Sequence, residues 1–217
     1  MGRKHILLLH VYLLLMSLTT DEISTEEKIK KAAMEAFTRK GYHATTTRDI
    51  AAAADINIAS LHYYFRSKDN LFQLVARGSL IQFNNLMIEV FAAQVPLKDK
   101  IYNFVERFTD FYVENPYLPG FIVAETERNS EVFNEVVKFS DNNSILREQL
   151  LELETAGQIR STSLANFISN LVGLTIFPFL CKNILSQEMN LDNDGFEAML
   201  DSRKKMIPRM IINDLYI

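Results

Sequence analysis

A cluster of hydrogen-bonding aromatic side chains stands out in the segment ASLHYYFRSKDNLF. His62, Tyr63 and Tyr64 are consecutive, and a basic residue follows two and four positions later. A helix with one buried face shows apolar residues at a spacing of about 3.6. Only Leu61 and Phe65 keep that spacing here. The histidine and the two tyrosines cannot all point inward, so we expect hydroxyl and imidazole groups on the outer face of this helix.

These outward groups have the chemistry to bind phosphate, whose oxygens accept hydrogen bonds from such donors. Lys68 adds to this interpretation because it falls in the first turn of the next expected helix, where the helix dipole disfavours a cation. A phosphate across that helix start would accept hydrogen bonds from the free backbone N–H groups and from Lys68 together. The alternative is a solvated lysine that costs about a few tenths of a kcal/mol.

Capping residues predict the helices that must position this cluster. Ser24, with Glu27 three residues later, forms a capping box that begins a helix, and Gly41 is placed to end it. Thr46, with Asp49 three residues later, begins a short second helix. Alanines in this second helix allow another helix to cross it closely.

The third helix carries the cluster. We expect Asp55 to take the turn before it, Asn57 to cap it, and Ser67 to cap the long helix that follows, to about residue 94. Ile56 and Leu61 are spaced as a hydrophobic staple. Two short helices joined by a three-residue turn form a helix-turn-helix, in which the second helix enters the major groove of DNA. Its outer face carries Ile58, Ala59, Ser60, His62 and Tyr63.

The segment TTTRDIAAAADINIASLHYYFRSKDNLF, from Thr45 to Phe72, resembles the DNA-binding domain of the TetR/AcrR family of bacterial transcriptional regulators. The resemblance covers residues 24–75, about a quarter of the chain. It implies an all-α fold with an N-terminal three-helix helix-turn-helix DNA-binding domain and a C-terminal helical ligand-binding and dimerisation domain. We expect a leader at residues 1–20, the DNA-binding domain at 21–77 and the second domain at 78–217.

The resemblance also implies roles for individual residues. Thr46 and Thr47 would bind phosphate, Arg48 would reach a base edge or a phosphate, and the third helix would read the major groove. The implied DNA-binding set is Thr46, Thr47, Arg48, Ile58, Ala59, Ser60, His62, Tyr63, Tyr64 and Lys68. Asp55 and Ala59 stand where the family usually has glycine, and His62 stands where tyrosine is usual. Asp tolerates the left-handed conformation better than most residues, so the turn can survive.

Further expectations about partners and effect come from the resemblance alone. Such proteins are usually homodimers that bind double-stranded operator DNA, and a small-molecule effector in the C-terminal domain releases the operator. Most are repressors. We expect a mostly apolar effector, because aromatic residues crowd the middle of the chain and ligand pockets are largely apolar. Candidate pocket residues are Phe108, Tyr112, Phe121, Glu125, Asn166, Asn170 and Phe177.

The C-terminal half shows helical patterns without chemical motifs. Helices are expected at about 98–114, 119–128, 131–155, 164–185 and 194–215. The segment 166–180 is apolar nearly all round, which predicts a helix buried on both sides. Its asparagines belong either to a pocket or interface or, with a slight preference, to a satisfied core, and Pro178 should kink it. The stripe from Phe196 to Ile211 predicts core and dimer seam, so the last two helices should form the homodimer.

Composition limits the classes of function. Residues 1–78 carry 11 basic and 8 acidic side chains, whereas residues 79–217 carry 12 and 19, so the half with the cluster is the basic one. Cys181 is the only cysteine, which excludes an internal disulfide and fits a reducing, cytoplasmic location. The apolar run Ile6–Leu15 is too short to span a bilayer. It is a signal-like segment, an artefact upstream of a start at Met16, or a packed helix.

Nothing in the sequence favours an enzyme or a cofactor. None of the four histidines shows metal-ligand spacing, and no glycine-rich phosphate loop, nucleophile elbow or carboxylate pair stands out. The remaining alternatives are a constitutive DNA binder, or a helical sensor switched by a protein partner and tethered to a membrane or exported if the leader is genuine.

Overall fold

The computed structural model describes residues 24–127, 131–137 and 144–217 of the chain, and the predicted leader lies outside them. These residues fold into helices joined by short connections, with no strand among them beyond an isolated bridge between Ile159 and Tyr216. The predicted all-α fold is therefore confirmed.

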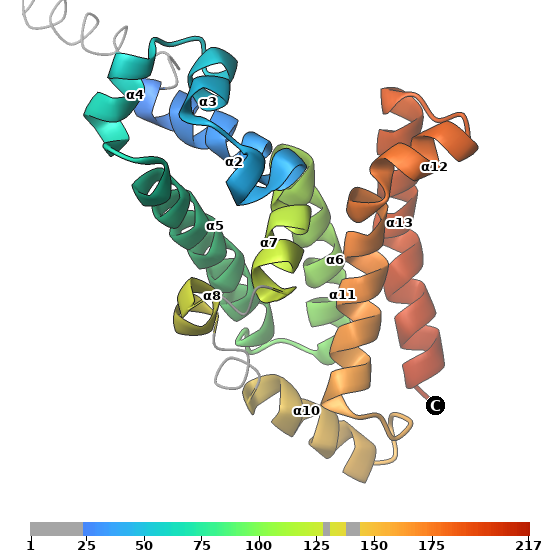
Figure 1. The fold of residues 1–217 in the computed structure, drawn as a ribbon. Coiled ribbons are helices and arrows are strands. Elements are labelled where there is room, and N and C mark those ends of the chain that lie inside the picture. The colour runs from blue at the N-terminus through green and yellow to red at the C-terminus, as the bar shows by residue number, and fades with distance from the viewer. Residues whose placement is uncertain (1–23, 128–130, 138–143) are drawn as a thin grey trace, which may run out of the picture.

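Three helices form the N-terminal head of the molecule: α2 (Thr25–Ala44), α3 (Thr47–Ala53) and α4 (Ile58–Phe65) (Figure 1). Their predicted N-caps at Ser24, Thr46 and Asn57 are all confirmed, since each side chain accepts a hydrogen bond from a backbone N–H of the first turn. Gly41 has φ of 76° and interrupts α2, although one further turn follows it to Ala44. The break therefore lies where a glycine at positive φ is favoured.

The turn between α3 and α4 depends on Asp55. Its φ of 53° is the left-handed conformation for which glycine is usual, and Asp adopts it more readily than most residues. Ile50 and Ala51 of α3 and Leu61 and Phe65 of α4 are buried. The helix-turn-helix thus has a core of its own, and this core fixes which side of α4 faces outward.

The long helix α5 (Lys68–Phe91) runs from the head into the C-terminal half (Figure 1). It begins at the predicted cap Ser67, whose hydroxyl accepts from the N–H of Asn70. It is unbroken across residues 77 and 78, so the predicted domain boundary falls inside a helix and stays a prediction. The ring of Phe72 on α5 packs against that of Phe121 on α7, with 6.0 Å between the ring centroids. The head and the C-terminal half therefore share one core.

The C-terminal half consists of further helices, of which α11 and α13 lie side by side and pack with α6. The bounds are α6 (Leu97–Glu114), α7 (Leu118–Glu127), α8 (Glu131–Val136), α10 (Ser144–Thr155), α11 (Leu164–Leu180), α12 (Lys182–Glu188) and α13 (Asn193–Leu215). The single helix predicted at 131–155 is wrong, because Val137 is not helical and α10 begins only at Ser144; residues 138–143 lie outside the described part. The helix predicted at 164–185 is also wrong, because the chain breaks after Leu180.

The break falls at Cys181, three residues after Pro178, and α12 continues at an angle of 66° to α11. Proline has no N–H, so the carbonyl four residues earlier, on Leu174, loses its helical donor. The guanidinium of Arg203 on α13 donates to this carbonyl at 2.7 Å. A side chain of one helix therefore supplies the hydrogen bond that the proline removes from the other.

None of the helices of the described ranges is by itself long and apolar enough to cross a membrane; only α11 and α12 taken together meet that length and composition, across their bend.

Candidate nucleic-acid interface

The outer face of α4 is a row of exposed side chains on a firmly anchored helix. Leu61 and Phe65 are 0% and 5% exposed, whereas Tyr63 and Tyr64 are 83% and 45% exposed, and His62 is exposed with them. The two tyrosine rings pack edge to face, 5.4 Å between centroids. The prediction that Leu61 and Phe65 point inward is confirmed, and the hydroxyls of both tyrosines lie on the outer side of α4.

The N-terminal end of α4 is narrow, as predicted. Ile58 and Ala59 are exposed and Ser60 is half-buried. The backbone N–H of Ser60 donates to the side-chain oxygen of Asn57 at 2.7 Å, which fixes the first turn. Small side chains at this end leave the helix free to approach a base edge, since the first turn of a recognition helix enters the groove first.

His62 has a second, local role. Its Nδ1 lies 3.1 Å from the carbonyl oxygen of Arg66, and because a carbonyl only accepts, the ring must donate there. Arg66 sits at φ of 60° after the end of α4, so this hydrogen bond stabilises the corner that leads into α5. A neutral ring that donates from Nδ1 has only an acceptor at Nε2, so His62 can donate to a phosphate only as the imidazolium.

The three consecutive threonines have different environments. Thr45 is buried, and its hydroxyl lies within hydrogen-bond distance of the carbonyls of Ala36 and Gly41. Thr46 donates to the carboxylate of Asp49 from both its hydroxyl, at 2.8 Å, and its backbone N–H, at 2.9 Å. Thr46 therefore has no donor left for the phosphate contact predicted for it while the cap is formed. Thr47 is half-buried at the start of α3, and its hydroxyl has no hydrogen bond within the described chain.

The carboxylate that closes this cap is held in its ionised form. Hydrogen bonds from the backbone and hydroxyl of Thr46, with a further contribution from Lys40 at 3.2 Å, lower the pKa of Asp49 to about 2. The cap of α3 therefore stays formed throughout the neutral pH range. Arg48, next to it in sequence, is exposed and lies on the same first turn of α3 as Thr47.

Lys68 is not a solvated lysine, because its ammonium contacts the protein. Its ammonium donates to the carbonyls of Tyr42 at 2.9 Å and Thr45 at 3.0 Å, and lies 4.2 Å from the centre of the Tyr42 ring. These carbonyls belong to the C-terminal end of α2, where a cation is favoured. The lysine that disfavours the start of its own helix thus stabilises the end of another. One of its three N–H donors remains for the predicted phosphate.

The predicted effector residues separate into two groups. Phe108, Tyr112, Phe121 and Glu125 are each 2% exposed or less, and burial raises the pKa of the Tyr112 hydroxyl. The structure brings Phe108 and Tyr112 together, 5.9 Å between ring centroids, within the C-terminal core.

The second group, on α11, lies on the exposed side of that helix. Asn166, Asn170 and Phe177 are all exposed, whereas Phe167 and Leu171 of the same helix are buried. Within the single chain the asparagines therefore lie outside the core, which leaves the pocket or interface alternative. Burial of the second side of α11 would need a partner subunit and stays a prediction. The apolar composition of this helix conceals one buried face and one exposed face, and these three side chains are not brought together with the first four.

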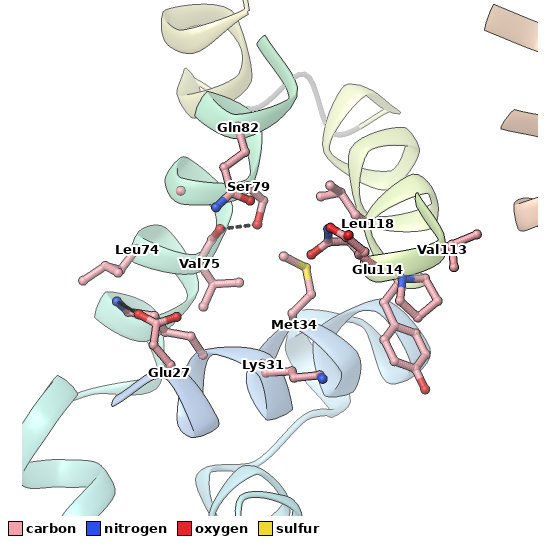
Figure 2. Close-up of a pocket in the computed structure, with 15 residues that line it drawn as sticks. Glu27, Lys31, Met34, Leu74, Val75, Ser79, Gln82, Val113, Glu114 and Leu118 are labelled. Atoms are coloured by element: carbon pink, nitrogen blue, oxygen red, sulfur yellow. Dashed lines mark hydrogen bonds and ion pairs between the residues drawn. The ribbon is translucent and has the colours of Figure 1, made fainter. Parts of the chain in front are cut away.

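A cavity that the sequence did not indicate lies between the head and the C-terminal half. It has a volume of about 780 Å³, and α2, α5 and the corner between α6 and α7 form its walls (Figure 2). None of the seven predicted effector residues lines it. No local pattern could have revealed it, because its walls come from three segments far apart in sequence. Groups of acidic, histidine or cysteine residues able to hold a metal ion are absent from the described residues.

Comparison with known proteins gives one family. Residues 29–75 match the family model described as bacterial regulatory proteins, tetR family, which spans all of α3 and α4. A probable HTH-type transcriptional regulator, YttP of Bacillus subtilis, is 23% identical over 171 residues, which are 76% of this chain and 82% of that protein.

Two further similarities agree with this. The negative regulator of the biofilm operon icaADBC, IcaR of Staphylococcus aureus, is 29% identical over 133 residues, 55% of this chain and 72% of that protein. The solved structure of HlyIIR, a haemolysin II transcriptional regulator, is 26% identical and superposes with a TM-score of 0.55, covering 82% of this chain and 96% of that one.

Proposed function

Because this chain belongs to the tetR family of bacterial regulatory proteins, we propose that it is a cytoplasmic repressor that binds operator DNA as a homodimer and is released by a small, mostly apolar effector. That it is a DNA-binding transcriptional regulator follows from the family. Repression is supported by IcaR, which is named a negative regulator.

The observation that supports the DNA-binding surface is the outer face of α4. A helix of eight residues, held by two buried side chains, presents Ile58, Ala59 and Ser60 at one end and the two exposed tyrosines further on. The small end is suited to base edges and the tyrosine hydroxyls to the phosphates at the groove walls. Thr47 and Arg48 at the start of α3 add donors beside it.

Removing one hydroxyl tests this surface. We expect Tyr63→Phe to weaken binding to the DNA upstream of the protein's own gene by about tenfold or more, because a hydrogen bond to a charged group contributes about 1.5–3 kcal/mol. Tyr63 is 83% exposed, so the folded protein should be unaffected. Fluorescence anisotropy with a labelled duplex measures the affinity.

The matched control is Tyr102→Phe, in an exposed tyrosine of α6 that is 42% exposed. It should bind the duplex as the unaltered protein does. Equal affinities of all three proteins, or no preference for the upstream duplex over a scrambled one, would reject α4 as the recognition helix.

The exposed side of α11 to α13 supports the homodimer. Large apolar side chains of these helices and of the C-cap of α12 have 40–63% of their surface exposed: Phe177, Leu180, Ile184, Met189, Met206 and Met210. Monomeric proteins rarely leave contiguous apolar patches beyond a few hundred Å² uncovered. Met206 and Met210 lie one turn apart on α13, and methionine adapts to irregular packing.

Charges on this surface should separate the subunits. We expect the double variant Met206→Glu, Met210→Glu to have the mass of one chain in light scattering, where the unaltered protein has the mass of two, because a buried unpaired carboxylate costs far more than the contact it replaces. Leu151→Glu, which alters an apolar side chain of α10 that is 63% exposed, should leave the dimer intact. A dimeric double variant would place the interface elsewhere.

Release by an effector is supported by the family, whose members combine a DNA-binding head with a helical C-terminal domain. Binding of effector and DNA must be reciprocal, with a coupling of about 1–3 kcal/mol. An effector that stabilises the protein should therefore lower its affinity for the operator by a similar free energy.

A further inference from the structure

The cavity between head and C-terminal half has the size of a small-molecule site. Its volume of about 780 Å³ lies within the range of roughly 300–1,000 Å³ that such sites occupy. Figure 2 shows Met34 rising from α2 between the α5 wall and the wall formed by α6 and α7. The lining residues are Glu27, Lys30, Lys31, Met34, Leu74, Val75 and, from the other segments, Gly78, Ser79, Gln82, Val113, Glu114, Asn115, Pro116, Tyr117 and Leu118.

Apolar side chains form the body of this cavity. Val75 and Leu118 are 5% and 2% exposed and lie on either side of Met34, which is half-buried (Figure 2). Leu74 and Val113, at opposite walls, are 46% and 44% exposed. An apolar molecule that contacts these lining side chains would remove part of their surface from water, which favours binding.

Most polar groups of the lining already have partners. Lys30 pairs with Glu27 at 2.9 Å, and the hydroxyl of Ser79 donates to the carbonyl of Val75 at 2.8 Å. Two charged groups have no ion pair within the described residues: the ammonium of Lys31 on α2 and the carboxylate of Glu114 at the end of α6. They are of opposite sign, so the lining as a whole has no net charge. A ligand with a net charge would gain from one of these two groups and be repelled by the other.

We propose that this cavity is the effector site and that it takes one uncharged small molecule with an apolar body and a polar, hydrogen-bonding end. The proposal rests on the proposed function, because it assigns a site to the effector that function requires. The sequence analysis predicted the effector site in the aromatic core of the C-terminal half, and this proposal places it outside that core.

The position of the cavity gives the ligand a direct effect on the head. Tyr117, which lines it, donates from its hydroxyl to Glu35 of α2 at 2.8 Å and accepts at its carbonyl from the hydroxyl of Thr38 at 3.3 Å. Gly120, one turn on, approaches Thr38 so closely that a Cβ there would lie 3.2 Å from its methyl group. A molecule held between α2 and this corner therefore acts on the contact that orients the head.

A glycine offers a way to fill the cavity without disturbing its walls. Gly78 lies on α5 at the lining, and a Cβ built on it meets nothing within 4 Å. Gly78→Phe should place a ring in the cavity, and Gly78→Ala adds only a methyl group to the same helix. Both changes also favour the helical conformation, so both proteins should fold.

The experiment follows Nile red, an uncharged dye whose fluorescence rises in apolar surroundings, on the full chain. We expect Gly78→Phe to weaken dye binding by at least about tenfold, because overpacking a site removes the room for its ligand, and Gly78→Ala to bind as the unaltered protein does. Among competitors with one ten-carbon body, decanol should displace the dye at lower concentration than decanoate or decyltrimethylammonium. Nile red or decanol should also weaken operator binding by the unaltered protein but not by Gly78→Phe.

Each of the following results would contradict one part of the proposal. If Gly78→Phe binds the dye as tightly as the unaltered protein does, the dye site is not this cavity. If decanol also still releases the operator from that variant, the proposed function stands and the effector binds elsewhere. If a charged competitor displaces the dye best, the ligand class is wrong. If the dye binds in the cavity but neither it nor decanol ever alters operator affinity, the cavity is not the effector site. Thermal unfolding curves of Gly78→Phe and Gly78→Ala serve as the control that both variants are folded.

Discussion

Operator affinity should fall about a thousandfold between 50 and 200 mM monovalent salt. Arg48 and Arg66 are exposed and Lys68 keeps one free donor, so the proposed interface has three cations per subunit available for phosphates. Six in a dimer give a slope of about −5 in log affinity against log salt, because each neutralised phosphate releases about 0.9 counterion. Fluorescence anisotropy across a salt series measures this slope.

Single substitutions separate this effect from general charge. Arg48→Gln or Arg66→Gln should each make the slope less steep by about 1.8 in a dimer, because two phosphate contacts are lost. Arg147→Gln, at an exposed arginine of α10 far along the chain from the head, should leave the slope unchanged. A slope shallower than about −2 would contradict a phosphate-gripping head, since so few contacts could not position α4.

Phe108→Ala should lower the free energy of unfolding by about 3–5 kcal/mol. The Phe108 ring is 1% exposed, stacks on Phe104 at 4.2 Å between centroids and meets Phe83 at 5.9 Å. Removing it leaves a cavity that this ordered stack cannot close. A domain of this size is stable by only about 5–15 kcal/mol, so the loss should be evident in a urea titration.

The same variant distinguishes a core residue from a pocket residue, which the sequence could not do. Tyr102→Ala, on the same helix but 42% exposed, should change stability by no more than about 0.5 kcal/mol. If Phe108→Ala costs less than about 1 kcal/mol and instead alters the response to effectors, the aromatic stack lines a ligand site after all.

The head could be predicted from the sequence because its signals are local. Capping side chains at Ser24, Thr46, Asn57 and Ser67 act within three residues of themselves, and each is found with the predicted hydrogen bond. The left-handed turn at Asp55 is of the same kind, since one residue's own conformation decides it.

What the sequence missed depends on contacts between distant segments. Lys68 could be recognised as out of place in its own helix, but its partners at Tyr42 and Thr45 lie on another. Which side of α11 packs within the chain could not be predicted for a related reason: an apolar composition all round gives no periodicity from which to tell the two faces apart. The cavity lined by Met34, Val75 and Leu118 exists only once three segments have packed.

The hydrogen bond between Arg203 and the carbonyl of Leu174 has an evolutionary consequence. As long as position 178 is proline, a residue without a side-chain donor at 203 leaves a part-buried carbonyl without this hydrogen bond, whereas with any other residue at 178 the helix supplies that donor itself. This contribution of the arginine therefore exists only in a proline background. Loss of the arginine costs this hydrogen bond only while the proline is present, so the effect of either substitution depends on the other although the positions lie on different helices.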